Sequence, residues 1–167
     1  YLCTNDVHVP RMPNERFRGK SVMGLRGEAI MQFDYTIGQI TQKLRDLGIA
    51  DNTLLIITSD NGPVLDDGYQ DKAVELAGSH KPGGPWRGGK YSAFEAGTAV
   101  PFIVSWAGHT PKGKVSDALV SHIDYMASLG ALIGAKLPLL AGIDSQDHLS
   151  TWLGQDDNSR AYVAAMA

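Results

Sequence analysis

Residues 53–63 read TLLIITSDNGP, an apolar run that passes directly into a cluster of turn-forming residues. A β-branched run of this length, bounded by Asp, Asn, Gly and Pro, predicts a buried strand from Thr53 to Thr58. In open α/β sheets, ligands bind at the carboxyl ends of the strands. Asp60 and Asn61, which follow this strand, are therefore the first candidates for a functional site.

Two explanations of Asp60 and Asn61 are open from the residue types alone. Carboxylate and amide oxygens are ligands that Ca²⁺ and Mg²⁺ prefer, although Ca²⁺ takes about six to eight of them. The same Asp-Asn-Gly-Pro sequence is also ordinary turn chemistry. Residue types by themselves favour the turn.

The elements around the strand predict an α/β fold. Apolar residues recur every three or four positions over about residues 25–47, which is typical of an amphipathic helix, and Gly48 is suited to its C-cap. A second strand is predicted over 100–106 and a short one over 118–121. Further helical segments are predicted over 70–76, 124–133 (with Asp124 as N-cap) and 148–153, and residues 91–97 are expected to form a loop or turn. Alternating strands and helices favour a layered sheet with flanking helices.

Composition narrows the class of protein. The chain has 167 residues, 43% hydrophobic and 20% charged, and a net charge of −3. This charge gives no reason to expect nucleic acid or an anionic membrane as a partner, and no apolar run reaches the length of a membrane span. A single cysteine, Cys3, excludes an internal disulfide and a thiolate zinc cage.

Three further residues are candidates for chemistry. Lys90 follows two glycines that would let a ligand approach the backbone, and it could hold an oxyanion. His8, in a loop before Pro10, could donate a proton or bind an anion. His80 lies in the long polar segment 64–89 and has the same two roles open to it. From the residue types alone, an ordinary solvated side chain is the favoured explanation for each of the three.

The order of these motifs resembles the type I, formylglycine-dependent sulfatases of the alkaline phosphatase-like superfamily, which include the arylsulfatases. The resemblance rests on the His-Val-Pro loop, the strand leading to Ser59–Pro63, and the Arg-Gly-Gly-Lys motif that ends at Lys90. Phe94-Glu95 and the Val-Pro-Phe-Ile-Val strand from Val100 follow in the family's order. It covers nearly all of residues 1–167, and it implies the C-terminal part of a sulfatase catalytic domain, truncated at both ends.

The resemblance also implies roles for the candidate residues. Asp60 and Asn61 match the pair that binds the active-site cation, usually Ca²⁺, with Mg²⁺ as the alternative. Lys90 matches the lysine that contacts the sulfate, and His8 the histidine near the leaving oxygen. Sulfate ester hydrolysis must stabilise charge at those oxygens, so the residue types suit the chemistry. His80 is a further candidate for substrate binding.

The chain departs from the family pattern in three respects. The Cys/Ser-x-Pro-Ser/Ala-Arg motif that yields the formylglycine nucleophile is absent, and it is expected in a part of the protein before Tyr1. Ala96 and Ala99 stand where the family commonly has Gly and Arg, and Ala107 stands where Pro is usual. The isolated chain is therefore expected to be inactive and to bind Ca²⁺ weakly or not at all.

The sequence thus predicts a sulfuric ester hydrolase acting on an aryl or carbohydrate sulfate, with this chain supplying part of the metal and sulfate site. Two alternatives are open: a phosphoryl or phosphonate hydrolase of the same superfamily, and a non-catalytic fragment with an incomplete site. The expected partner is a sulfated small molecule or glycan. The resemblance implies a periplasmic or secreted location.

Overall fold

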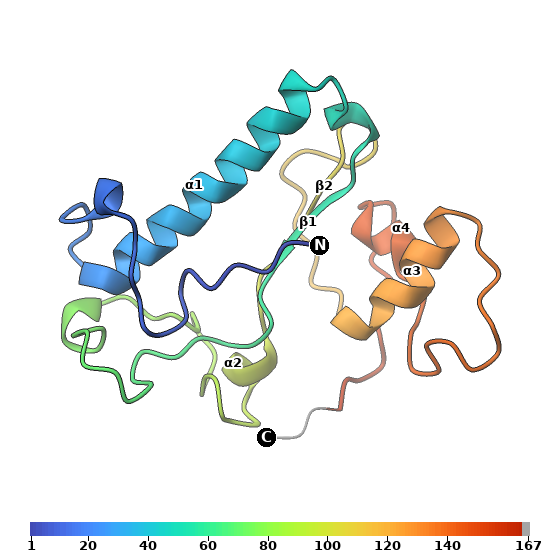
Figure 1. The fold of residues 1–167 in the computed structure, drawn as a ribbon. Coiled ribbons are helices and arrows are strands. Elements are labelled where there is room, and N and C mark those ends of the chain that lie inside the picture. Colours follow the sequence, from blue (N-terminus) through green and yellow to red (C-terminus); the bar gives the residue numbers. More distant parts are fainter. Residues whose placement is uncertain (165–167) are drawn as a thin grey trace. The chain divides into compact units, whose positions relative to one another are not determined.

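The computed structural model describes residues 1–164, which form two compact units. The first unit contains residues 1–50 and 58–101, and the second contains residues 51–57 and 102–164. The helices are α1 (Gly24–Asp46), α2 (Glu95–Thr98), α3 (Tyr125–Leu132) and α4 (Leu149–Trp152), and the strands are β1 (Leu55–Thr58) and β2 (Phe102–Ser105). Figure 1 shows these elements along the chain. No helix of this described part combines the length and the hydrophobicity that a membrane crossing requires.

The first unit is built on α1, the longest helix (Figure 1). Most residues of its predicted apolar stripe are half-buried, but Leu47 at the end of the stripe is 57% exposed. Gly48 ends the helix in a left-handed conformation, φ +66°, donating its N–H to Arg45 O. The most buried part of α1 is its N-terminal end, where Arg26, Glu28 and Ala29 are buried. Glu28 accepts a hydrogen bond from the Gly19 N–H at 2.7 Å, so polar contacts as well as apolar ones hold this end.

The two strands pair in a two-stranded sheet, the only sheet in residues 1–164. The prediction that the strand beginning at Thr53 is buried is wrong for this chain, because all four residues of β1 are only half-buried. In β2 the burial alternates, with Phe102 half-buried and Ile103 53% exposed. This alternation is typical of a strand with one face covered.

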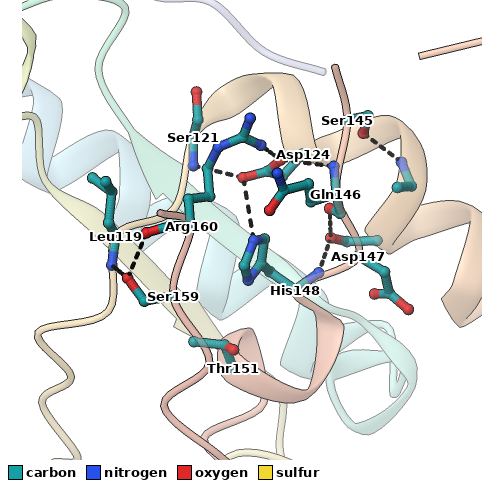
Figure 2. Close-up of polar contacts among 12 residues, drawn as sticks. Leu119, Ser121, Asp124, Ser145, Gln146, Asp147, His148, Thr151, Ser159 and Arg160 are labelled. Carbon is teal, nitrogen blue, oxygen red and sulfur yellow. Dashed lines mark hydrogen bonds and ion pairs between the residues drawn. The ribbon is translucent and has the colours of Figure 1, made fainter. Parts of the chain in front are cut away.

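The second unit has its own apolar cluster and a buried polar one. Phe102, Tyr125 and Trp152 pack with ring centroids 5.5–6.2 Å apart, joining β2, α3 and α4. Asp124, fully buried, accepts hydrogen bonds from the Ser121 and Gln146 N–H groups and from Arg160 (Figure 2). Asp124 thus precedes α3 as predicted, but its role as a side-chain N-cap is wrong, since the carboxylate turns back to Ser121 instead.

Two local predictions are wrong, and a third is right only in part. Residues 70–76 form no α-helix, because the Asp71 carboxylate bonds the Ala73 N–H and pairs with Arg11, leaving only a 3₁₀ turn at Glu75–Ala77. Residues 118–121 form no strand, since Leu119 makes one backbone bond, to Arg160, while its N–H is taken by the Ser159 hydroxyl. The loop or turn expected over 91–97 ends in the helical turn α2.

Candidate functional site

His8 and Lys90, 82 residues apart in sequence, meet in the first unit. The Lys90 Nζ lies 3.3 Å from the His8 Nε2. His8 is in an irregular loop and is exposed, whereas the Lys90 side chain retains 16% of its exposure. The structure therefore brings together the two residues that the sequence proposed for contacts with an oxyanion.

The hydrogen bonds of His8 define its tautomer. The His8 Nδ1 lies 2.7 Å from the Val9 carbonyl oxygen, which can only accept, so Nδ1 carries the proton. The Lys90 ammonium can only donate, so Nε2 presents its lone pair. In this arrangement His8 is neutral, and the positive charge of the pair is on Lys90.

Asp67 and Tyr91 complete the surroundings of Lys90. The Asp67 Oδ2 lies 3.8 Å from the Lys90 Nζ, and the Tyr91 hydroxyl donates to the Asp67 Oδ1 at 2.7 Å. The Tyr91 hydrogen bond, followed by the charge of Lys90, lowers the pKa of Asp67 below its ordinary value. Tyr91 has φ +72°, an uncommon conformation for a residue other than glycine. Asp67 is thus kept ionised beside Lys90.

The turn after β1 is fastened to α2 and to the Gly-Gly-Lys segment by one main-chain bond each. The Gly62 N–H donates to Gly97 O, and the Lys90 N–H donates to Pro63 O, both at 2.9 Å. A Cβ on Gly62 would lie 1.8 Å from the Ala96 carbonyl oxygen, and one on Gly89 would lie 2.5 Å from Pro63 O. Glycine is required at both positions because the backbones approach too closely for any side chain.

Asp60 and Asn61 suit a hard divalent cation as part of a larger ligand set. Asp60 is exposed, and within residues 1–164 no hydrogen bond reaches its carboxylate. The Asn61 amide nitrogen donates to Gly62 O at 2.9 Å, which leaves the carbonyl oxygen available. Among the described residues, however, no group of three or more His, Cys, Asp or Glu side chains could hold a metal ion. The chain therefore offers two oxygen donors and not a complete site.

A cavity of about 260 Å³ opens beside Lys90. Its walls come from the two segments that the main-chain bonds join, namely residues 63–65 and 88–90, together with Pro82 and Gly83. Pro63, Val64 and Leu65 make one side of it mainly apolar. The cavity could accommodate the part of a substrate next to a group that Lys90 binds.

His80 is not brought to this cluster. It is exposed, and in the described part of the chain no side-chain hydrogen bond or ion pair joins it to His8 or Lys90. Sequence reasoning missed Asp67 and Tyr91, which complete the surroundings of Lys90. Nothing in the sequence pairs Asp67 with Lys90.

Comparison with known proteins defines the class. The sulfatase family model matches residues 1–135, and the chain belongs to the sulfatase family. It is 56% identical to an N-acetylgalactosamine-6-O-sulfatase of Bacteroides thetaiotaomicron, over 98% of this chain and 32% of that protein. It is 37% identical to the human N-acetylgalactosamine-6-sulfatase, over 92% of this chain and 28% of that protein.

Solved structures agree on the fold. A structure from a study of the metabolism of multiple glycosaminoglycans by Bacteroides thetaiotaomicron matches with a TM-score of 0.91 and 57% identity, over 94% of this chain and 32% of that chain. The PsFucS1 sulfatase from Pseudoalteromonas sp. matches with a TM-score of 0.76 and 28% identity, over 92% and 29%. The chain thus has part of the sulfatase, alkaline phosphatase-like α/β fold, and it spans about a third of the length of these relatives.

Proposed function

We propose that the protein containing this chain hydrolyses sulfate esters of carbohydrates, with 6-sulfated N-acetylgalactosamine units as the substrate class. The observation that carries the proposal is the contact between His8 and Lys90 beside the Asp60–Pro63 turn. Support for the substrate comes from the two N-acetylgalactosamine-6-sulfatases to which the chain is similar. An aryl sulfate is the alternative substrate, in keeping with the 33% identity to bovine arylsulfatase A.

Lys90 and His8 would contact different oxygens of the sulfate ester. The Lys90 ammonium would bind a non-bridging sulfate oxygen, where charge must be stabilised. The bound anion would replace His8 as the acceptor of the Lys90 hydrogen bond. His8 could then take up a proton from water at Nε2 and donate it to the leaving oxygen, while the bond from Nδ1 to Val9 O keeps the ring in place.

Asp60 and Asn61 are proposed to supply two ligands of the divalent cation that sulfatases use, Ca²⁺ before Mg²⁺. A cation held there would neutralise charge on the sulfate oxygens. The formylglycine nucleophile of the family has no matching motif in this chain, so the 167-residue chain alone is expected not to turn over sulfate esters. His80 remains a proposal for contacts farther along the substrate, and a periplasmic or secreted location remains one as well.

The test is sulfate release by the full-length protein from 6-O-sulfated N-acetylgalactosamine and from 4-nitrophenyl sulfate. Removing a group that stabilises the transition-state oxyanion lowers kcat by about 10²–10³-fold, so Lys90→Ala should show a loss of that order. Lys43→Ala is the matched control, because Lys43 is an exposed lysine on α1. Retention of activity in Lys90→Ala would contradict the proposal, and preference for the phosphate ester of the same sugar would favour the phosphoryl hydrolase alternative.

A further inference from the structure

We propose that Arg11 is a positioning residue that, with Asp71, fixes His8 relative to Lys90. The inference rests on the proposed function, because it concerns the geometry of the same two side chains. Arg11 lies three residues after His8, and it is among the least exposed side chains of the described chain, with 2% of its surface exposed. It touches neither Lys90 nor the expected position of a substrate, so it would act through His8.

The Arg11 guanidinium bonds to three separate segments. Its Nη1 lies 2.5 Å from the Asp71 Oδ2, its Nε donates to Val7 O at 3.0 Å, and its Nη2 donates to Val64 O at 3.3 Å. Asp71 is itself held, because its second oxygen accepts from the Ala73 N–H at 3.0 Å. A planar guanidinium with five donors can satisfy this set at once, which the single ammonium of a lysine cannot.

The contact with Val7 fixes the peptide plane that carries His8. The Val7 carbonyl and the His8 N–H belong to one planar unit. Arg11 bonds the carbonyl end, and the Asn5 carbonyl accepts from the N–H end at 3.1 Å. Since His8 lies in a loop without regular secondary structure, these two bonds are what set the direction in which its side chain leaves the backbone.

The contact with Val64 links the Val7–His8 peptide plane to the backbone of Lys90. Val64 follows Pro63, whose carbonyl accepts the Lys90 N–H at 2.9 Å. A short series of bonds therefore runs from the Val7–His8 peptide through Arg11 to the Pro63–Val64 segment and on to the Lys90 backbone. This series of bonds brings the ends of the two side chains together, with the His8 Nε2 at 3.3 Å from the Lys90 Nζ.

A double-mutant cycle in the full-length protein tests this role. The variants are Arg11→Lys, His8→Ala and the two combined, and the readout is kcat/KM for 6-O-sulfated N-acetylgalactosamine. Misplacement of a reacting group by about 1 Å can lower the rate about 10²-fold, so Arg11→Lys should lose about 10- to 100-fold. If Arg11 acts through His8, it should lose less than about 2-fold when His8 is already absent, because the effects of coupled residues do not add.

Two further variants separate positioning from folding. Arg11→Met with Asp71→Leu removes both buried charges together, a replacement that is often neutral or stabilising. It should therefore fold with little change in melting temperature and still lose activity as Arg11→Lys does. Arg26→Lys is the matched control, because Arg26 is also buried and donates to Val64 O at 3.1 Å, but no bond joins it to Val7 in the described chain. It should lose much less activity.

The outcomes distinguish this inference from the proposed function. A severe loss in His8→Ala, combined with independent losses in the double variant, would overturn the role of Arg11 and leave the proposed function standing. Equal losses in Arg26→Lys and Arg11→Lys would overturn it as well. Full activity of His8→Ala would overturn the role proposed for His8, and with it the reason for a positioning residue.

Discussion

Two buried aspartates, Asp71 in the first unit and Asp124 in the second, hold irregular segments together in different ways. Around Asp71 the junction is Arg11, which donates to carbonyl groups of two other segments. Around Asp124 the junction is the carboxylate itself, which accepts from the Ser121 and Gln146 N–H groups and from Arg160 (Figure 2). An arginine can fasten loops that present free carbonyls, and an aspartate can fasten loops that present free N–H groups.

The two clusters also differ in whether they contact the candidate site. Asp124 joins the start of α3 to the loop before α4, and no candidate site residue takes part. Arg11 joins the loops that carry His8 and approach Lys90. We therefore expect changes at Asp124 to affect stability alone, and changes at Arg11 and its neighbours to affect activity as well.

The largest effect on stability is expected for Asp124→Ala. It would leave Arg160 without its ion-pair partner and two N–H groups without acceptors. Breaking a buried pair in this way costs about 3–5 kcal/mol. Urea unfolding of the full-length protein measures it, with the exposed Asp157, which pairs with Lys114 at 3.5 Å, as the control position. Equal effects of Asp124→Ala and Asp157→Ala would show that the Asp124 cluster is not the junction described here.

A smaller loss is expected for Gly62→Ala. The added Cβ would meet the Ala96 carbonyl oxygen at 1.8 Å, so the turn after Asn61 or α2 must move. Overpacking of this kind costs about 1–3 kcal/mol. Gly38→Ala is the matched control, because Gly38 lies within α1 with open space around it, and alanine there should stabilise the helix by about 1 kcal/mol. Thermal unfolding should therefore shift in opposite directions, and shifts of the same sign would contradict the close contact.

The smallest effect concerns the pH dependence of stability. Because the pKa of Asp67 is lowered in the folded state, first by the Tyr91 hydroxyl, its contribution is present above the unfolded pKa, about 3.9, and is lost as pH falls through the folded value. Tyr91→Phe should therefore be less stable than the parent at neutral pH, and this difference should diminish below about pH 4. Unfolding measured across pH 2–7 checks this, and a difference that grows with acidity would contradict it.

Local sequence signals predicted most of the helices and strands. Contacts between residues far apart in the sequence account for the segments that were predicted wrongly. The periodicity of α1 placed it within one residue at each end, and Gly48 ended it as expected. The helix predicted over 70–76 does not form, because Arg11, 60 residues away, draws the Asp71 side chain into a buried pair. No local pattern contains that information.

The candidate site was likewise predictable only where its residues belong to local sequence motifs. His8, Asp60, Asn61 and Lys90 belong to short motifs whose order resembles one family, and the family is confirmed. Their roles remain predictions. Asp67 and Tyr91 could not be assigned, because their place beside Lys90 depends on how a long loop returns to the Gly-Gly-Lys segment.

The most direct test of the central claim is a double-mutant cycle of His8→Ala and Lys90→Ala in the full-length protein, measured as kcat/KM for a 6-O-sulfated N-acetylgalactosamine substrate. Residues that share one bound group show coupling of about 0.5–3 kcal/mol, whereas independent sites add within about 0.3–0.5 kcal/mol. We expect the double variant to lose at least about 1 kcal/mol less than the sum of the single losses. Losses that simply add would show that the two side chains, although 3.3 Å apart, do not work on the same sulfate.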